Sequence, residues 1–166
     1  MAIVSYPSSG QAERIDPDIL LAETRMAGFA MVNSYLRQYR ILADYLEMKP
    51  ASALVFLTIL VAASQRFVRR TPIQDEFRGV APLPPEDLIP ISRRALASAT
   101  GLPRETVRRI VAELIASGDV IEVGRKGVIN RFGELLRPGA QHAVKLLAAE
   151  YAQTFEALSR LGVLEQ

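Results

Sequence analysis

The chain has 166 residues, of which 49% are hydrophobic and 23% charged, a composition typical of a globular protein that excludes disorder for most of its length. It has no cysteine, which excludes disulfides, thiolate metal sites and cysteine nucleophiles, and His142 is its only histidine. Residues 1–10 lack a basic segment followed by an apolar run, so we expect no secretory signal and a cytoplasmic location.

We expect a flexible N-terminal segment over residues 1–15 and two helices over residues 16–70, which form core or dimer contacts. Asp16 and Pro17 predict the first helix start, because aspartate caps helices and proline is favoured at the first helical position. Apolar residues then recur at steps of mostly three and four until Pro50 ends the helix. A helix of roughly thirty residues would reach about 45 Å, which is long for a chain of this size. Because such a helix would extend beyond a small core, part of its apolar stripe should meet a second subunit or another long helix.

Ser52 predicts the N-cap of a second helix that runs to Arg70. Its most apolar stretch, residues 51–63, is shorter than the roughly 20 residues that a bilayer requires, so we expect it to be buried inside protein. Residues 71–90 contain half of the ten prolines and predict a linker or arm, with a short extended piece near residues 73–77.

The positive charge is concentrated in one segment and is almost entirely arginine. Residues 92–131 carry eight basic and four acidic side chains, a net charge of +4, whereas the rest of the chain has a net charge of −2. This asymmetry makes the segment the candidate surface for a polyanion, although a charged helix face is often only solvated.

The same segment begins with a pattern for two short helices joined by a tight turn. Ser92 can cap the first helix, and Gly101 can end it because glycine tolerates a positive φ. Ala97 is small enough to let the helices cross closely, and the second helix begins near Pro103. Its apolar repeat before Gly118 consists of Val107, Ile110, Val111, Leu114 and Ile115.

A β-hairpin follows, with strands near residues 120–123 and 128–130. Arg125 and Lys126 lie at its tip between two glycines. Residues 89–91 can supply a small additional strand beside this hairpin.

Through residues 91–102, 103–118 and 119–130 the chain resembles the winged helix-turn-helix family of transcriptional regulators, in which the hairpin is the wing. The flanking helices resemble the MarR-type arrangement, in which N- and C-terminal helices build a dimer. The resemblance implies a mainly α fold with a small β-hairpin wing. The DNA-binding domain would span residues 91–131, flanked by long N- and C-terminal helices.

A helix fits the major groove of DNA, and its exposed N-terminal residues reach base edges. We expect residues 103–117 to occupy this groove and the wing, residues 119–130, to contact the minor groove or phosphates. Arg104 or Arg108 can donate two hydrogen bonds to guanine, and Glu105 can accept one from cytosine or simply be a first-turn acid favoured by the helix dipole. The expected base-reading residues are Arg104, Glu105, Thr106, Arg108 and Arg109.

Other polar residues of the segment would position the protein on the DNA backbone rather than read bases. They lie in the first short helix and at the hairpin tip. The expected backbone contacts are Ser92, Arg93, Arg94, Ser98, Thr100, Arg125 and Lys126.

Residues 132–166 include an amphipathic helix after Pro138 and Gly139. Together with the first helix it is the expected homodimer interface, which would hold two recognition helices about 34–36 Å apart on a near-palindromic site. Alternatively, both helices fold back on the core of the monomer.

Regulators of this type often bind a small effector. The candidate residues of such a pocket are Tyr35, Tyr39 and Phe56, although aromatic residues at helical spacing more often belong to the hydrophobic core.

We expect no cofactor and no metal. We expect no enzymatic activity, because no nucleophile has a base at a recognisable spacing. The main alternative function is a winged helix that binds another protein, while RNA is disfavoured because no aromatic strand platform is present.

Overall fold

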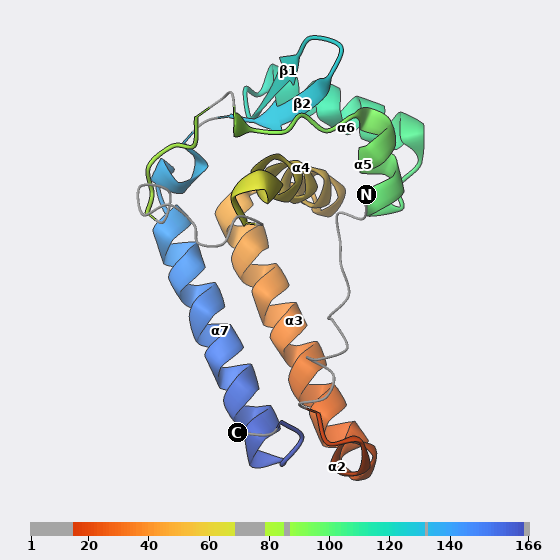
Figure 1. Ribbon diagram of the computed structural model, residues 1–166, viewed down its shortest axis with the longest axis vertical. Helices are drawn as coiled ribbons and strands as arrows, with labels where there is room; N and C mark the ends of the chain where they lie inside the picture. Colours follow the sequence, from red (N-terminus) through yellow and green to blue (C-terminus); the bar gives the residue numbers. More distant parts are fainter. Residues whose placement is uncertain (1–14, 69–78, 85–86, 132, 165–166) are drawn as a thin grey trace. The chain divides into compact units, whose positions relative to one another are not determined.

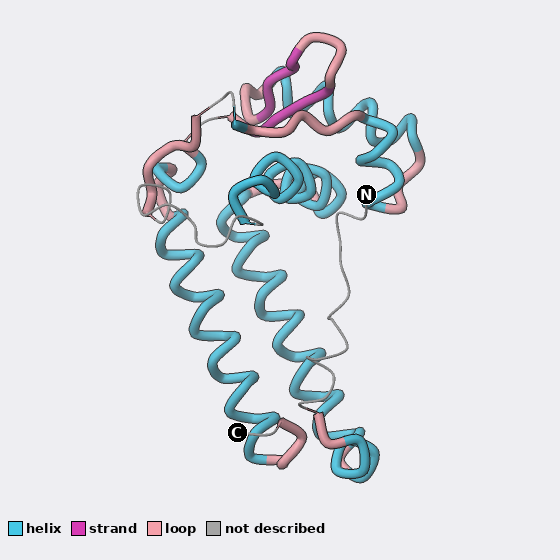
Figure 2. The backbone as a smooth tube through the Cα atoms, viewed as in Figure 1, coloured by secondary structure: helices cyan, strands magenta, loops and turns pink. Residues whose placement is uncertain are grey.

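The computed structural model describes residues 15–68, 79–84, 87–131 and 133–164 (Figure 1). Over these residues the chain is mainly helical with one two-stranded antiparallel sheet, which confirms the expected mainly α class with a small β-hairpin (Figure 2). The described residues divide into two compact units. Glu47–Ala140 form the hairpin unit, and the described parts of Ser5–Leu46 and Gln141–Gln166 form the long-helix unit.

The long-helix unit begins at Ile15, which forms a β-bridge with Leu164. Ile15 is therefore paired rather than part of a flexible segment, and residues 1–14 lie outside the described residues. Asp16 caps helix α2 (Pro17–Ala22) as predicted: its carboxylate accepts hydrogen bonds of 3.0 Å from the backbone N–H groups of the second and third helical residues.

The expected continuous first helix is wrong, because it is interrupted at Glu23, where φ is −98° and ψ is 14°. Helix α3 (Thr24–Leu46) follows directly. The hydroxyl of Thr24 donates to the carbonyl oxygens of Leu20 and Leu21 at 2.8 and 2.9 Å, which helps to satisfy the carbonyl groups at the end of α2. A threonine hydroxyl thus stabilises a break that the apolar spacing alone does not reveal.

Helix α7 (Ala140–Arg160) is the predicted C-terminal helix, and polar side chains join it to α3. Arg37 donates from Nε and Nη2 to the two carboxylate oxygens of Glu150, both at 2.7 Å. The hydroxyl of Thr154 donates to that of Ser34 at 2.6 Å, and both Ser34 and Glu150 are buried. The contact between these two helices therefore includes a buried polar network.

In the hairpin unit, helix α4 (Pro50–Val68) begins at Pro50, so the predicted N-cap at Ser52 is wrong. Proline suits the first helical position, where the backbone N–H has no helical partner.

Among the described residues no single helix is long and apolar enough to cross a bilayer. Helix α3 and the part of α4 up to Arg66 meet that requirement only as a pair with a break between them. The predicted segment of residues 16–70 places α4 with the preceding helix, whereas α4 packs against α5, α6 and β2. There it buries Val55, Phe56 and Ile59.

Helices α5 (Arg93–Thr100) and α6 (Arg104–Ala116) form the predicted pair with its tight turn. The Ser92 hydroxyl accepts from the backbone N–H of Ala95 at 3.2 Å, and Gly101 ends α5 with a φ of +70°. Both features agree with the sequence prediction, because each depends on the type of residue at a helix end.

The sheet consists of β1 (Val120–Val123) and β2 (Gly127–Asn130), paired so that Ile121 lies opposite Ile129. The additional strand that we expected over residues 89–91 is reduced to one bridge, in which Ile91 and Val128 exchange two backbone hydrogen bonds of 3.0 Å. The backbone of Ile89 instead donates to the carbonyl of Ala63 in α4, so this segment turns from the sheet to the helix.

The end of the proline-rich segment belongs to the core rather than to a linker. Leu88 is buried with Ala63 of α4 and Ile129 of β2. The predicted extended piece at residues 73–77 lies outside the described residues.

Gly127 allows the bridge to Ile91, because its φ is +136° and a side chain there would collide with the carbonyl of Ile91. We expect Gly127→Ala to lower the free energy of unfolding by about 2–4 kcal/mol, from backbone strain and the displaced bridge. Urea unfolding followed by circular dichroism measures the change. Gly28→Ala is the matched control: no atom lies within 4 Å of the added methyl group, and it should stabilise α3 by roughly 0.5–1 kcal/mol. Equal stability of Gly127→Ala and wild type would contradict the conclusion that the bridge to Ile91 requires glycine at position 127.

Candidate nucleic-acid interface

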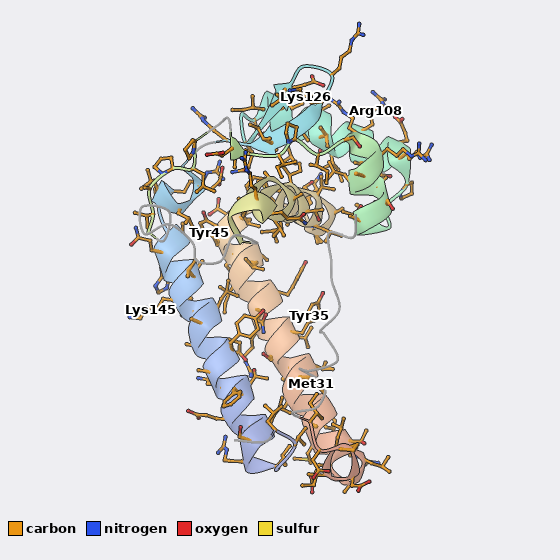
Figure 3. All side chains as sticks on the ribbon, viewed as in Figure 1. Met31, Tyr35, Tyr45, Arg108, Lys126 and Lys145 are labelled. Atoms are coloured by element: carbon orange, nitrogen blue, oxygen red, sulfur yellow. The ribbon has the colours of Figure 1, made fainter. Side chains whose placement is uncertain are left out.

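Helix α6 separates its apolar and charged side chains on opposite faces. Val107, Ile110, Val111 and Leu114 are buried, as the spacing predicted. Of the five candidate base-reading residues, Thr106 is half-buried and the others are exposed: Arg104, Glu105, Arg108 and Arg109. The four charged side chains thus lie on the solvent side of a helix whose other side is fixed in the core. Figure 3 labels Arg108 among them.

Two of these arginines are held by acids of the same helix. Arg108 donates from Nε and Nη2 to the carboxylate of Glu105 at 2.9 and 2.6 Å. This contact lowers the pKa of Glu105 and raises that of Arg108, because each charged form stabilises the other. Arg109 makes a single, longer contact of 3.4 Å with Glu113.

Other basic side chains of the unit have no such partner. Arg94 in α5, Arg104 at the start of α6, and Arg125 and Lys126 at the hairpin tip make no ion pair with another described residue. All four are exposed. They are therefore available for an anion without first breaking an ion pair within the described part of the chain.

Three of the expected backbone contacts already have structural partners. Arg93 forms an ion pair of 2.9 Å with Glu122 of β1, which ties the start of α5 to the hairpin. The hydroxyl of Thr100 donates to the carbonyl of Leu96 at 2.8 Å, and that of Ser92 caps α5. Ser98 is exposed. The helix pair and the hairpin are thus fixed to each other by the Arg93–Glu122 pair and the Ile91 bridge.

An ionic cluster that sequence analysis missed stabilises the base of the hairpin. Asp119, just before β1, accepts from the hydroxyl of Ser117 at 2.5 Å and from the guanidinium of Arg137, which also contacts Glu134 at 3.2 Å. Partial burial favours the neutral form of Asp119, but these two hydrogen bonds outweigh it and lower its pKa. Burial raises the pKa of Glu134. Because Arg137 is 18 residues from Asp119, no local sequence pattern indicates the cluster.

The candidate effector residues belong to different units. Phe56 is buried in the core of the hairpin unit, whereas Tyr35 and Tyr39 are exposed on α3 in the long-helix unit. The hairpin unit contains a cavity of about 90 Å³, lined by residues such as Leu60, Leu88 and Glu134, but this is smaller than usual ligand pockets.

Within the described ranges, no group of three or more histidine, aspartate or glutamate side chains is placed to hold a metal ion.

Comparisons with protein-family models, curated proteins and solved structures find no significant match to this chain.

Proposed function

We propose that this protein is a sequence-specific double-stranded DNA-binding transcriptional regulator of the winged helix-turn-helix type. In this proposal α6 enters the major groove and the hairpin, residues 119–130, contacts the minor groove or phosphates. The observation that carries it is the division of α6 into a buried apolar face and an exposed face with Arg104, Arg108 and Arg109. A rigidly supported helix of this kind suits the major groove, and arginine suits both phosphates and guanine.

The surroundings of α6 support the same proposal. The backbone N–H groups at the start of a helix favour anions, and exposed arginines lie at the starts of α5 and α6. The hairpin tip adds Arg125 and Lys126, also without ion-pair partners among the described residues. These groups would contact phosphates on either side of the groove that α6 occupies.

One observation favours the alternative of a protein-binding module. The acids Glu105 and Glu113 neutralise part of the arginine charge on α6, and a mixed-charge face can also bind a protein. The two functions differ in whether the chain binds duplex DNA and whether that binding depends on salt.

Fluorescence anisotropy titrations of a pool of genomic duplex fragments, at several salt concentrations, test the proposal. Wild type should bind with an affinity that falls steeply with salt and should enrich some fragments. Arg104→Ala/Arg108→Ala should bind about 10- to 100-fold more weakly and lose the enrichment.

The matched control is Arg25→Ala/Arg40→Ala, which removes the same charge from exposed positions of α3. It should bind almost as well as wild type. Failure of the folded wild-type protein to bind DNA at low salt would favour the protein-binding alternative. If the two double variants lost the same affinity for DNA, the binding would depend on net charge and not on the arginines of α6.

We further propose that the protein acts as a homodimer through the long-helix unit. The apolar side chains of this unit are largely directed to solvent, in contrast to the polar network between α3 and α7. Phe29, Tyr35 and Tyr151 are 63%, 68% and 62% exposed. Exposed apolar surface of this kind marks protein interfaces, and a second copy of the chain would cover it symmetrically.

Light scattering after size-exclusion chromatography at micromolar concentration measures the state of association. We expect twice the 18.3 kDa mass of one chain. Tyr151→Glu should weaken the dimer at least about tenfold, because it places a charge in an apolar interface. Gln153→Glu introduces the same charge at another exposed position of α7 and should leave the dimer intact. A monomeric wild type would contradict the proposal.

A further inference from the structure

The Glu105–Arg108 pair on α6 has a specific geometry. The carboxylate of Glu105 accepts from Nε and from Nη2 of Arg108, at 2.9 and 2.6 Å, so it occupies one edge of the guanidinium. The two side chains are one turn apart on the exposed face of the helix.

A guanidinium has five N–H donors, and this contact uses one donor on Nε and one on Nη2. The edge formed by the remaining N–H groups of Nη1 and Nη2 has no partner among the residues that the structure describes. Those two donors are parallel, which is the arrangement that the O6 and N7 acceptors of guanine require. Glu105 therefore occupies one edge of Arg108 and leaves the guanine-binding edge available.

The other arginines of α6 lack this arrangement. Arg109 contacts Glu113 through Nη1 alone at 3.4 Å, a weaker contact that does not fix the plane of the guanidinium. Arg104 makes no ion pair with another described residue. Arg108 is thus the arginine whose orientation is set before any ligand binds, which reduces the entropy lost on binding.

Resting on the proposed DNA-binding function, we propose that Glu105 is a positioning residue that orients Arg108 to read a guanine. The acid carries a negative charge that opposes binding to phosphates. It therefore lowers the affinity for DNA of any sequence while increasing the preference for guanine at one base pair. This differs from direct reading of cytosine by Glu105, because Glu105 would then contribute independently of Arg108.

Selection from a pool of duplexes with a randomised central region, followed by sequencing of the retained DNA, tests this assignment on the intact chain. The proteins are wild type, Glu105→Ala, Arg108→Ala and the double variant, with Glu113→Ala as the matched control that also removes an acid from α6. Glu105 and Glu113 have side chains 75% and 55% exposed, so the variants should fold, and thermal unfolding by circular dichroism checks this.

We expect Glu105→Ala to bind the unselected pool more tightly than wild type but to lose about tenfold in preference for guanine at one position. Arg108→Ala should lose the same preference, and the double variant should lose no more than Arg108→Ala alone. Glu113→Ala should bind the pool more tightly and keep the preference.

Two results would overturn the positioning role while leaving the proposed function intact: an unchanged guanine preference in Glu105→Ala, or losses that multiply in the double variant. Absence of any DNA retention by folded wild type is a different result, which overturns the proposed function and this inference with it.

Discussion

The hairpin unit depends on the burial of α4. This helix is apolar on most of its surface, and its Val55, Phe56 and Ile59 are almost inaccessible to solvent. Helices α5 and α6 and strand β2 all pack on it, so each must direct apolar side chains toward it. On α6 this requirement fixes Val107 and Val111 inward and leaves the arginines outward. The charged face is therefore held rigidly by packing on the opposite side of the same helix.

The two units use polar and apolar side chains in opposite ways. In the hairpin unit the core is apolar and the charged groups are on the surface. In the long-helix unit a bidentate Arg37–Glu150 pair lies between α3 and α7, while large apolar side chains are exposed. Glu150 is buried, whereas the side chain of Arg37 is 54% exposed. Such a pair contributes little net stability, but any other pairing of the helices leaves the buried carboxylate without its partner. A polar contact between the two helices, together with an apolar surface that is left exposed, supports the proposed association with a second copy.

Features determined by local chemistry were predicted well from the sequence. The caps at Asp16 and Ser92, the glycine at the end of α5 and the inward face of α6 each depend on residues within a few positions of one another. The helix break at Glu23 was missed, because a stripe with steps of three and four continues across it. The cluster of Asp119 with Arg137 and the burial of Leu88 were also missed, since they join residues that are distant in the chain. In the candidate site the sequence indicated which arginines are exposed but not that Glu105 holds Arg108, which depends on the rotamers of both side chains.

In the proposed function, the charged face of α6 and the tip of the hairpin form one DNA-binding surface. The most direct measurement is a titration of the isotope-labelled protein with a duplex enriched from genomic fragments, followed through its backbone amide NMR signals. We predict that the largest shifts occur at residues 92–94, 104–109 and 124–127, and that they weaken together as salt is added. Shifts confined to other surfaces, or none at all from a folded protein, would contradict DNA binding by this surface.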